Sequence, residues 1–561
     1  AALLPRETLA FVHVPDVSGA RAQWHETDIY KLWREPAVQD FLQRPLALTP
    51  TSGNFRQQLA QADALKIRDA FVAITAWDDN GPKIVAGFRF QGSADDAEKF
   101  IARWQGNAPE VKRETVTYQQ HQIAVVTRDT VTTATVYDRD WFLAADDIPT
   151  LKTFLDRIDG RMTDRITTLA ADEEFASALK RMPATYVAFG YGRLERFFSR
   201  IAKTLPASEQ NGQGSLLRRI RTVAATTNFE NGKFRDVVFV AMPKAADEAV
   251  LTRSSLALTT SDSFLYFASL LNLPNQMPEA GAAAANGFPA AMQSLLSAFT
   301  GKGITLDYWK SAFGPELGVI GDWPQNSRIP ALLATLPVRD AGKAKEIAAT
   351  AAAASAQDDG WTASVKDGVQ YYSRPPTNPM VPIAPTIALS DALLVAGLDA
   401  DSVENAMKRA AAKAGSGVSA LKAYQEAQSR VPAAKHSFTY LDTALFYTRL
   451  DAAVRPMLIM AAAFVPNISQ TVDLGKLPPA EVIAKHLSPI VMSQNYESDG
   501  YRTESFGPIS MYQAAVGVAV ATGAGTSFLQ RQLHGGPIAS PAGVSQPTPP
   551  APPAQTPVPT P

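Results

Sequence analysis

The chain has 561 residues, 46% of them hydrophobic and 19% charged, which is a balance typical of globular rather than disordered proteins. Its 53 basic and 54 acidic residues give a formal net charge of −1, which argues against nucleic acid as a partner because such partners select a basic excess. Cysteine is absent, which excludes disulfides, thiolate metal sites and cysteine nucleophiles. One hydrophobic core rarely serves more than about 250–300 residues, so we expect several domains.

In chain order, the first elements predicted are a pair of helices within 24–43, with Pro36 at a helix start. Residues 70–77 and 83–90 then read as two strands of a hairpin, because an Asp/Asn/Gly/Pro cluster separates two β-rich runs. The signals that follow predict a helix over 93–104 and further strands between 114 and 145, ending in the apolar run 141–145.

Asp147 is expected to cap the next helix, which carries Pro149 in its first turn. The inward-facing stripe predicted for this helix comprises Leu151, Phe154, Leu155 and Ile158.

A similar series of elements returns about 250 residues later. Trp77 and Trp323 end matching strands 246 residues apart, and Asp140 and Asp391 precede matching apolar strands 251 residues apart. The second series comprises strands over 316–323 and 328–336, a helix over 339–354, a strand over 391–396 and a helix over 399–409. Three further matches preserve the order: 7–14 with 262–269, 181–184 with 430–433, and 228–235 with 495–502.

An internal repeat of this length indicates duplicated domains rather than solenoid turns. We therefore predict an α+β protein made of two tandem, divergent copies, 1–250 and 251–530, followed by a proline-rich disordered tail, 531–561. Each copy is expected to be a mostly antiparallel, hairpin-built sheet with packed helices, because alternating βαβ crossovers are not evident.

The chain opens with Ala1-Ala2 ahead of an ordered-looking segment, as after signal-peptide cleavage, which together with the missing cysteine favours a bacterial extracytoplasmic location, periplasmic or secreted. The best apolar runs, 456–465 and 514–523, are shorter than the ~20 residues that a membrane span requires. We expect no transmembrane segment and expect both runs to be buried in a core.

No constellation of residues indicates a catalytic site. The sequence lacks the metal-binding, serine-hydrolase and nucleotide-binding motifs, and no two histidines have metal-ligand spacing. We therefore predict no metal and no cofactor, assign no catalytic residue, and expect each histidine to be structural. The histidines are His13, His25, His121, His436, His486 and His534.

Three local patterns invite a functional interpretation and are better explained by structure. Asn495, Glu497 and Asp499 resemble the start of a calcium loop, but the twelfth position holds Phe506 instead of an acid. Asn231-Gly232 and Asp499-Gly500 instead suit two-residue hairpin turns, with Glu497 facing Arg502 across the second hairpin.

The other two patterns are acidic pairs and tryptophans. Adjacent carboxylates such as Asp146-Asp147 and Asp358-Asp359 point in opposite directions and do not share a proton, so capping and solvation explain them. Trp77 and Trp323 are expected to pack in or beside a core, with a paired aromatic binding platform as the alternative.

The opening of the chain resembles secreted bacterial proteins of a domain-of-unknown-function family. The residues that carry this resemblance are Leu4-Pro5-x-x-Thr8-Leu9-Ala10-Phe11-Val12, Tyr30-Lys31-Leu32-Trp33 and, later, Asp499-Gly500-Tyr501-Arg502. The resemblance implies export and brings no activity or site residues.

Three functions remain open. The first is a non-enzymatic binding or scaffold protein of the cell envelope, whose partner is an unknown protein or a hydrophobic ligand and whose oligomeric state is unknown. The second is a hydrophobic-ligand or lipid carrier, which requires a cavity in at least one copy, whereas a scaffold requires filled cores. The third is a hydrolase whose site lies between the copies.

Overall fold

The computed structural model describes most of the chain. It describes residues 1–47, 66–78, 81–93, 95, 97–98, 112–128, 131–162, 167–201, 220–244, 249–271, 297–354, 360–376, 383–412, 417–464 and 473–511. Below, the first half denotes the described residues up to 244, and the second half denotes those from 249 onward.

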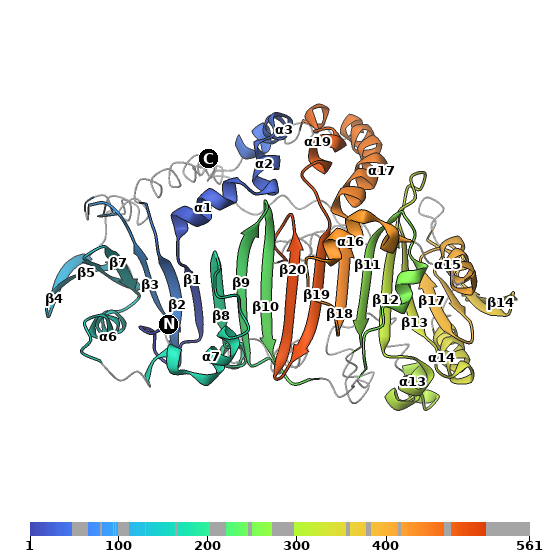
Figure 1. The fold of residues 1–561 in the computed structure, drawn as a ribbon, viewed down its shortest axis with the longest axis horizontal. Coiled ribbons are helices and arrows are strands. Elements are labelled where there is room, and N and C mark those ends of the chain that lie inside the picture. Colours follow the sequence, from blue (N-terminus) through green and yellow to red (C-terminus); the bar gives the residue numbers. More distant parts are fainter. Residues whose placement is uncertain are drawn as a thin grey trace, which may run out of the picture. The chain divides into compact units, whose positions relative to one another are not determined.

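The strands of both halves join one twenty-stranded sheet in which every described pairing is antiparallel (Figure 1). The first half contributes β1 (Ala10–Val14), β2 (Ala70–Asp78), β3 (Gly81–Arg89), β4 (Lys112–Tyr118), β5 (His121–Arg128), β6 (Val131–Asp138), β7 (Trp141–Ala145), β8 (Ala188–Gly192), β9 (Thr222–Glu230) and β10 (Lys233–Ala241). The second half contributes β11 (Ser263–Leu270), β12 (Glu316–Asp322), β13 (Ala331–Pro337), β14 (Thr362–Lys366), β15 (Val369–Ser373), β16 (Thr386–Leu389), β17 (Leu393–Gly397), β18 (Ser437–Leu441), β19 (Ile490–Glu497) and β20 (Gly500–Gly507).

Strand order is the same in the two halves. From its outer edge inward the first half runs β4-β5-β6-β7-β3-β2-β1-β8-β9-β10, and the second runs β14-β15-β16-β17-β13-β12-β11-β18-β19-β20. Each strand of the first half therefore has a positional counterpart ten strand numbers later. The predicted antiparallel α+β class is confirmed.

Helices occupy matching places in the two connectivities. The first half has α1 (Val17–His25), α2 (Asp28–Arg34), α3 (Pro36–Ala47), α6 (Ile148–Ile158), η2 (Leu169–Ala171), α7 (Glu173–Leu179) and α8 (Leu194–Ile201). The second half has η3 (Ser254–Leu258), α13 (Leu306–Ala312), α14 (Ala341–Ala354), α15 (Ala400–Ala412), η4 (Val418–Ala420), α16 (Lys422–Gln428), α17 (Thr443–Phe464), η5 (Leu474–Lys476) and α19 (Ala480–Ala484). The series α6-η2-α7 between β7 and β8 thus corresponds to α15-η4-α16 between β17 and β18.

Local sequence explains where these helices begin. Asp147 accepts a hydrogen bond from the Thr150 amide and caps α6, as predicted, and Pro36 opens α3. The inward stripe of α6 is also confirmed, because Leu151, Phe154 and Leu155 are buried and Ile158 is partly buried against them.

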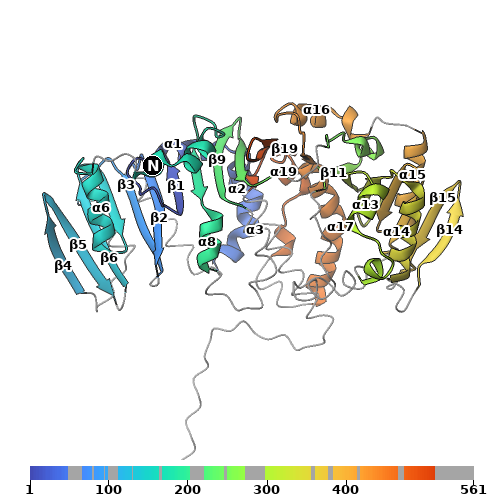
Figure 2. The same ribbon diagram turned by 90° about the horizontal axis from the view of Figure 1, so that it is seen from below.

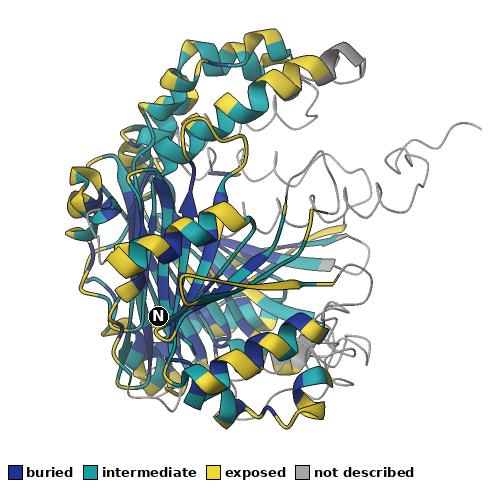
Figure 3. Cartoon of the chain, turned by 90° about the vertical axis from the view of Figure 1, so that its right-hand side faces the viewer, coloured by how far each residue is buried: buried dark blue, intermediate teal, exposed yellow. Residues whose placement is uncertain are grey.

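Both faces of the sheet carry helices (Figures 1 and 2). On one face, α6 packs on β3, β6 and β7, and α7 packs on β9. The second half matches, with α15 on β13, β16 and β17 and α16 on β18 and β19, and the cores on this face bury residues such as Phe11 and Tyr266. On the opposite face, α13 and α14 bury Leu336 and Leu389, whereas Val12 and Val72 of the first half stay about half exposed there. The burial colouring of Figure 3 shows the dark blue core along the strands and exposed residues on the outer sides of the helices.

The halves meet where β10 pairs with β20 along eight residues, a contact that we call the seam. Val237, the fifth residue of β10, lies opposite Glu504, the fifth residue of β20. β10 therefore pairs with its own counterpart, β20, in antiparallel register. The pairing has the symmetry of a two-fold axis that passes between Val237 and Glu504. The predicted boundary between residues 250 and 251 falls in the connection between β10 and η3.

The hairpins on either side of the seam correct one prediction. The turn Asn231-Gly232 forms as expected, with φ of 52° and 78°. The predicted turn Asp499-Gly500 is wrong by one residue, because Ser498 and Asp499 form the turn and Gly500 begins β20. A Cβ on Gly500 would lie 2.4 Å from the Val240 carbonyl oxygen, so this glycine permits close approach of β20 to β10.

Other predictions divide into confirmed, wrong and untested ones. The hairpin strands are confirmed as β2 and β3, and the alanine-rich helix is confirmed as α14. Burial of the apolar run 456–465 is wrong for Met457–Met460, which are 62, 38, 57 and 60% exposed in chain order. Asp358-Asp359, the run 514–523 and the tail 531–561 lie outside the described residues.

We predict that Gly500→Ala destabilises the protein because the added methyl group must displace the Val240 carbonyl at the seam. Overpacking of this kind costs about 1–3 kcal/mol of the free energy of unfolding. The shift of the urea unfolding midpoint measures it. Gly190→Ala in β8 is the control, since a Cβ there meets nothing within 4 Å, and equal midpoints for the two variants would contradict this account of the seam.

Candidate functional site

A pocket of about 560 Å³ opens in the first half between the sheet and α7, and we call it the first-half pocket. Aromatic and aliphatic side chains form most of its wall. They come from the segment before β1 and from β1, β2, α6, α7 and β8, and they include Leu4, Phe11, Phe71, Phe154, Phe175 and Phe189. A concave, mainly apolar space of this size is typical of small-molecule sites.

The aromatic rings of the wall hold one another in place. The Phe71 ring stacks on Phe154 with centroids 5.5 Å apart, and Phe175 meets Phe189 edge-on at 6.1 Å. Offset and edge-on ring pairs are favourable beyond the burial of their area. The wall is therefore shaped by contacts that exist without an occupant.

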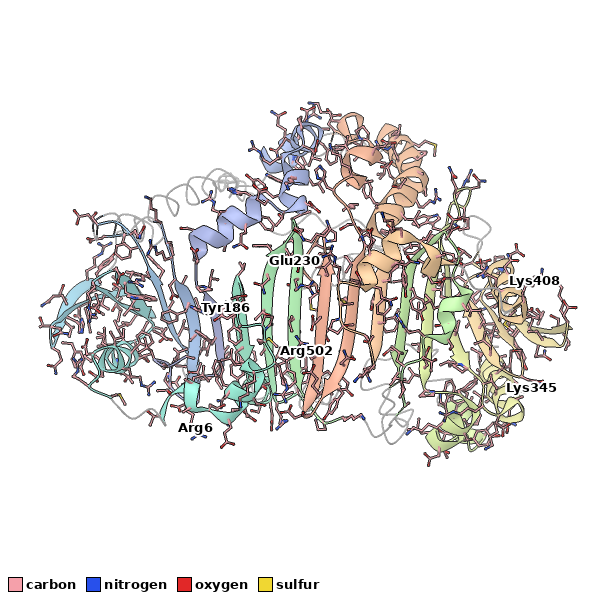
Figure 4. All side chains as sticks on the ribbon, in the orientation of Figure 1. Arg6, Tyr186, Glu230, Lys345, Lys408 and Arg502 are labelled. Carbon is pink, nitrogen blue, oxygen red and sulfur yellow. The ribbon has the colours of Figure 1, made fainter. Side chains whose placement is uncertain are left out.

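Three polar side chains form a hydrogen-bonded series at the pocket, and we call them the trio. His13 Nε2 lies 3.0 Å from Asp69 Oδ1, and His13 Nδ1 lies 3.0 Å from the Tyr186 hydroxyl. His13 comes from β1 and Asp69 directly precedes β2. Tyr186, labelled in Figure 4, stands two residues before β8. All three line the pocket.

A neutral His13 ring satisfies both contacts in one tautomer. An ionised Asp69 only accepts, so His13 Nε2 donates to it and the neutral ring keeps Nδ1 as an acceptor for the Tyr186 hydroxyl. Burial and, second, the negative charge of Asp69 raise the pKa of Tyr186 above its ordinary value, so this hydroxyl keeps its proton. The trio then presents acceptor lone pairs on Tyr186 and Asp69.

The second half fills the corresponding space. The helices α7 and α16 begin at 173 and 422, and β8 and β18 begin at 188 and 437, both 249 residues apart. The pocket residues Phe175, Leu179 and Phe189 therefore correspond to Tyr424, Gln428 and Phe438. Arg253 reaches all three of these counterparts, with its guanidinium 4.8 Å from the Phe438 ring centroid and Nη1 3.3 Å from Gln428 Oε1 and 3.5 Å from the Tyr424 hydroxyl.

A buried carboxylate holds Arg253 in that position. Glu316 is 5% exposed and accepts hydrogen bonds from the amides of Thr252, Arg253 and Ser254 at 2.7, 3.1 and 3.0 Å. Glu316 is the first residue of β12, where β2 has Ala70. The first half thus lacks the anchor that closes the second.

The trio is also confined to the first half. His13 pairs with Phe189 across β1 and β8, and the residue that pairs with Phe438 across β11 and β18 is Ala268. Pro315 precedes β12 where Asp69 precedes β2, and Lys435 stands where Tyr186 stands. The two halves share a frame and differ in the side chains that line it.

A buried ion pair fixes the α7 wall of the pocket. Asp172 caps α7 by accepting from the Phe175 amide at 3.0 Å and pairs with Arg193 at 2.8 Å, where Arg193 is 2% exposed. Burial alone would raise the pKa of Asp172, but the Phe175 amide and the Arg193 and Arg6 charges outweigh it and hold the pKa below its ordinary value. The ionised form of Asp172 is therefore the one that supports the wall.

The histidines have separate surroundings. His121 is buried with Nε2 2.8 Å from Asp159, His486 lies 2.6 Å from Glu35, and the rings of His25 and His436 pack on Tyr30 and Tyr501. His534 lies outside the described residues. Among the described residues, no three or more His, Asp and Glu side chains gather as a metal-ion group.

The other patterns noted in the sequence are occupied by internal contacts. Asn495 accepts from the Lys435 amide at 2.7 Å, and Asp499 pairs with Arg181 at 2.5 Å. Glu497 lies opposite Gly500 rather than Arg502 in the ladder, and its carboxylate lies 3.8 Å from the Arg502 guanidinium.

The acidic pair and the tryptophans also have structural partners. Asp146 accepts from the Ile84 amide at 3.0 Å while Asp147 caps α6, so the two carboxylates serve different elements. Trp77 meets Phe197 edge-on at 5.4 Å, and Trp323 is buried against Phe264 and Phe446. These contacts are packing, and they bring the two tryptophans to no common site.

Charged side chains lie along the seam, among them Glu230 and Arg502 (Figure 4). Arg235 bonds Glu230 at 2.6 Å and the Arg430 carbonyl at 2.9 Å. Its counterpart Arg502 bonds Glu504 at 2.5 Å and the Arg181 carbonyl at 3.0 Å. The hydrogen bond from Arg235, ahead of all other influences, lowers the pKa of Glu230, which favours the ionised carboxylate.

No protein-family profile matches the chain, and no curated protein is similar to it. Three solved structures, described as crystal forms I, III and IV of TP0453, are similar to part of it, with 8, 6 and 7% identity and TM-scores of 0.24, 0.25 and 0.24. They cover 44, 44 and 43% of this chain and 80, 81 and 79% of their own chains. A likeness this weak supports no conclusion about family or function.

We predict that Asp172→Asn lowers the free energy of unfolding at pH 7 by about 3–5 kcal/mol, because it leaves Arg193 buried without its counter-ion. The folded pKa of Asp172 lies below the unfolded value of about 3.9, so its stabilisation is present above that value and is lost as the pH falls through the folded pKa. The difference between variant and parent should therefore shrink between pH 7 and pH 3. Urea unfolding at both values measures it, with the exposed neighbour Glu173→Gln as control, and a pH-independent difference would contradict the role of the charge.

Proposed function

We propose that this protein is a non-enzymatic binding protein that carries an elongated, mainly apolar small molecule in the first-half pocket. The observation that carries the proposal is a pocket of about 560 Å³ with preformed aromatic walls and a hydrogen-bonded polar group, the trio. A carrier requires such a cavity in at least one half, whereas a pure scaffold requires both halves to be filled. The second half, closed by Arg253, fits the scaffold requirement alone.

The chemistry of the trio favours a ligand whose polar end donates a hydrogen bond. In the neutral His13 tautomer, the Tyr186 hydroxyl donates to His13 and its oxygen is left as an acceptor, and the charge of Asp69 opposes a second anion nearby. Lys180 also lines the pocket, but it is exposed, so water screens its charge. We therefore assign the ligand class as a long-chain alcohol or a molecule with an equivalent hydroxyl end.

The seam gives less support to the hydrolase alternative. A general acid needs a carboxyl group whose pKa is raised, and Glu230 has the opposite shift because Arg235 bonds it. Arg502 similarly engages Glu504. The described seam is thus an ion-paired contact, and the first-half pocket offers the better site.

The proposal includes two features expected from the sequence. The first is an origin of the two halves by duplication, which the matched strand order and the two-fold pairing of the seam support. The second is the extracytoplasmic location, which rests on the cysteine-free sequence and its resemblance to secreted bacterial proteins.

We predict that Ala176→Leu weakens binding of 1-decanol by about tenfold, because the larger side chain on α7 occupies the pocket. Displacement of Nile red from the protein by 1-decanol measures this affinity. Filling an apolar void leaves the folded state intact, so the thermal midpoint should not fall.

The matched control for that experiment is Gln425→Leu, which introduces leucine at the counterpart position on α16 in the second half. Gln425 is exposed and the space beside it holds Arg253, so the affinity should stay unchanged. Equal weakening by both variants, or none by Ala176→Leu, would remove the first-half pocket as the site.

We predict that Tyr186→Phe weakens binding of 1-decanol by about three- to tenfold, the effect of one neutral hydrogen bond, and leaves binding of Nile red unchanged. Decanoate should bind more weakly than 1-decanol to the parent protein, because Asp69 repels its charge. The same competition assay at pH 7.5 tests both statements. A preference for decanoate would overturn the assignment of the polar end while leaving the apolar pocket in place.

A further inference from the structure

The first two turns of α17 are firmly attached to the sheet. Asp442 caps the helix by accepting from the Leu445 amide at 2.9 Å, and the Phe446 ring packs on Phe264 and Trp323 at 5.2 and 5.9 Å. One turn later, Arg449 bonds the Trp323 carbonyl at 3.0 Å and Asp262 at 2.9 Å. These contacts fix the direction in which the helix leaves the sheet, beyond the ends of β18 and β19 (Figure 1).

Among the described residues, the last polar attachment of the helix is Arg455. Its guanidinium pairs with Asp451 at 2.7 Å and bonds the carbonyls of Leu477 and Pro478 at 3.1 and 2.6 Å. Pro456 follows, and after it come Met457, Leu458, Ile459 and Met460, which we call the helix tip. Their exposures of 62, 38, 57 and 60% leave four large apolar side chains in succession facing water. The other exposed large apolar residues of the described chain stand singly in sequence.

The helix tip is apolar on all sides. Successive helical residues point about 100° apart, so four of them surround the axis. A groove on a protein partner covers one stripe of a helix, with anchors three or four residues apart, and would leave part of this tip in water. A medium that surrounds the helix covers it fully, and the acyl region of a lipid layer is such a medium.

The dimensions fit insertion at a surface rather than a span. Four helical residues rise about 6 Å, within the depth of about 5–10 Å to which interfacial apolar groups enter a bilayer. None of the described helices is long and apolar enough to cross a membrane. The tip is thus suited to dip into one leaflet.

The charges beside α17 match a neutral lipid surface. On α17 itself Asp451 pairs with Arg455, and on the neighbouring elements α3 and η5 the pairs are Lys476 with Asp40 at 2.8 Å and Arg44 with Asp473 at 3.8 Å. These pairs hold three cationic and three anionic side chains. The helix α19, which also packs on α17, adds Glu481 and, just after it, Lys485 paired with Glu35 at 2.8 Å, so cations are not in excess. A collar of this kind is complementary to zwitterionic headgroups and has no excess of cations that would select anionic lipids.

We propose that the helix tip of α17 docks this protein on a lipid bilayer by inserting Met457–Met460 among the acyl chains of zwitterionic lipids. Docking is independent of the first-half pocket, since the two lie in different halves of the chain. It also gives a physical reason for four exposed apolar side chains that no described core covers.

Flotation of the full chain with phosphatidylcholine vesicles tests the proposal. The parent protein should float with the vesicles, and the same fraction should float in 50 and 500 mM sodium chloride, because apolar insertion is not screened. The double variant Met457→Glu, Ile459→Glu should lower the floating fraction at least tenfold. The control is Met162→Glu, which places the same charge at a methionine that is 42% exposed elsewhere and should float like the parent.

A second readout keeps the test valid if the double variant folds poorly. Met460→Trp places a fluorophore at the tip, and its emission should shift to shorter wavelengths on addition of the vesicles. A parent protein that stays unbound, a double variant that floats unchanged, or an unshifted Met460→Trp emission would overturn membrane docking. A parent that ignores vesicles but dissociates from dimer to monomer in the double variant would overturn it in favour of a second copy covering the tip.

Discussion

The pairing of β10 with β20 is the contact on which the rest of the structure depends, because it turns two ten-stranded sheets into one. Each strand would otherwise be an open edge with unpaired amides and carbonyls, and such edges recruit other strands. The register places Val237 opposite Glu504, so the backbone amides and carbonyls of β10 pair with those of β20, its counterpart in the other half. Arg235 and Arg502 then reach across to the carbonyls of Arg430 and Arg181, which ties the helices behind the seam to it.

The two halves have the same strand order, but the space between sheet and helix is occupied differently in each. In the second half, Glu316 holds the segment around Arg253 over Phe438, and the space between sheet and helix is used for stability. In the first half, the same space has Ala70 in place of the carboxylate and remains open beside the trio. A cavity forfeits packing energy, which is tolerable here because the filled half and the seam support the same sheet.

Sequence patterns predicted the elements whose cause is local. The cap at Asp147 and the turn at Asn231 are fixed by neighbours three residues away or fewer, and both formed as expected. The trio could not be predicted, since 56 residues separate His13 from Asp69 and 173 separate it from Tyr186. The turn at Gly500 was predicted one residue too late for a related reason. A glycine is needed at this position because the carbonyl of Val240, far away in the chain, lies too close for a Cβ, and not because of the turn.

The prediction that the apolar end of α17 is buried was wrong for Met457–Met460. Hydrophobicity indicates that a segment is unstable in water, but it does not indicate which surface covers the segment. Burial in a core requires a partner surface, and the attachments of this helix end at Arg455, where Leu477 and Pro478 provide the last acceptors. Beyond that point the same apolar sequence meets solvent. Leaving four large side chains in water is costly, so the exposed run is best explained by an apolar surrounding that the described residues do not provide.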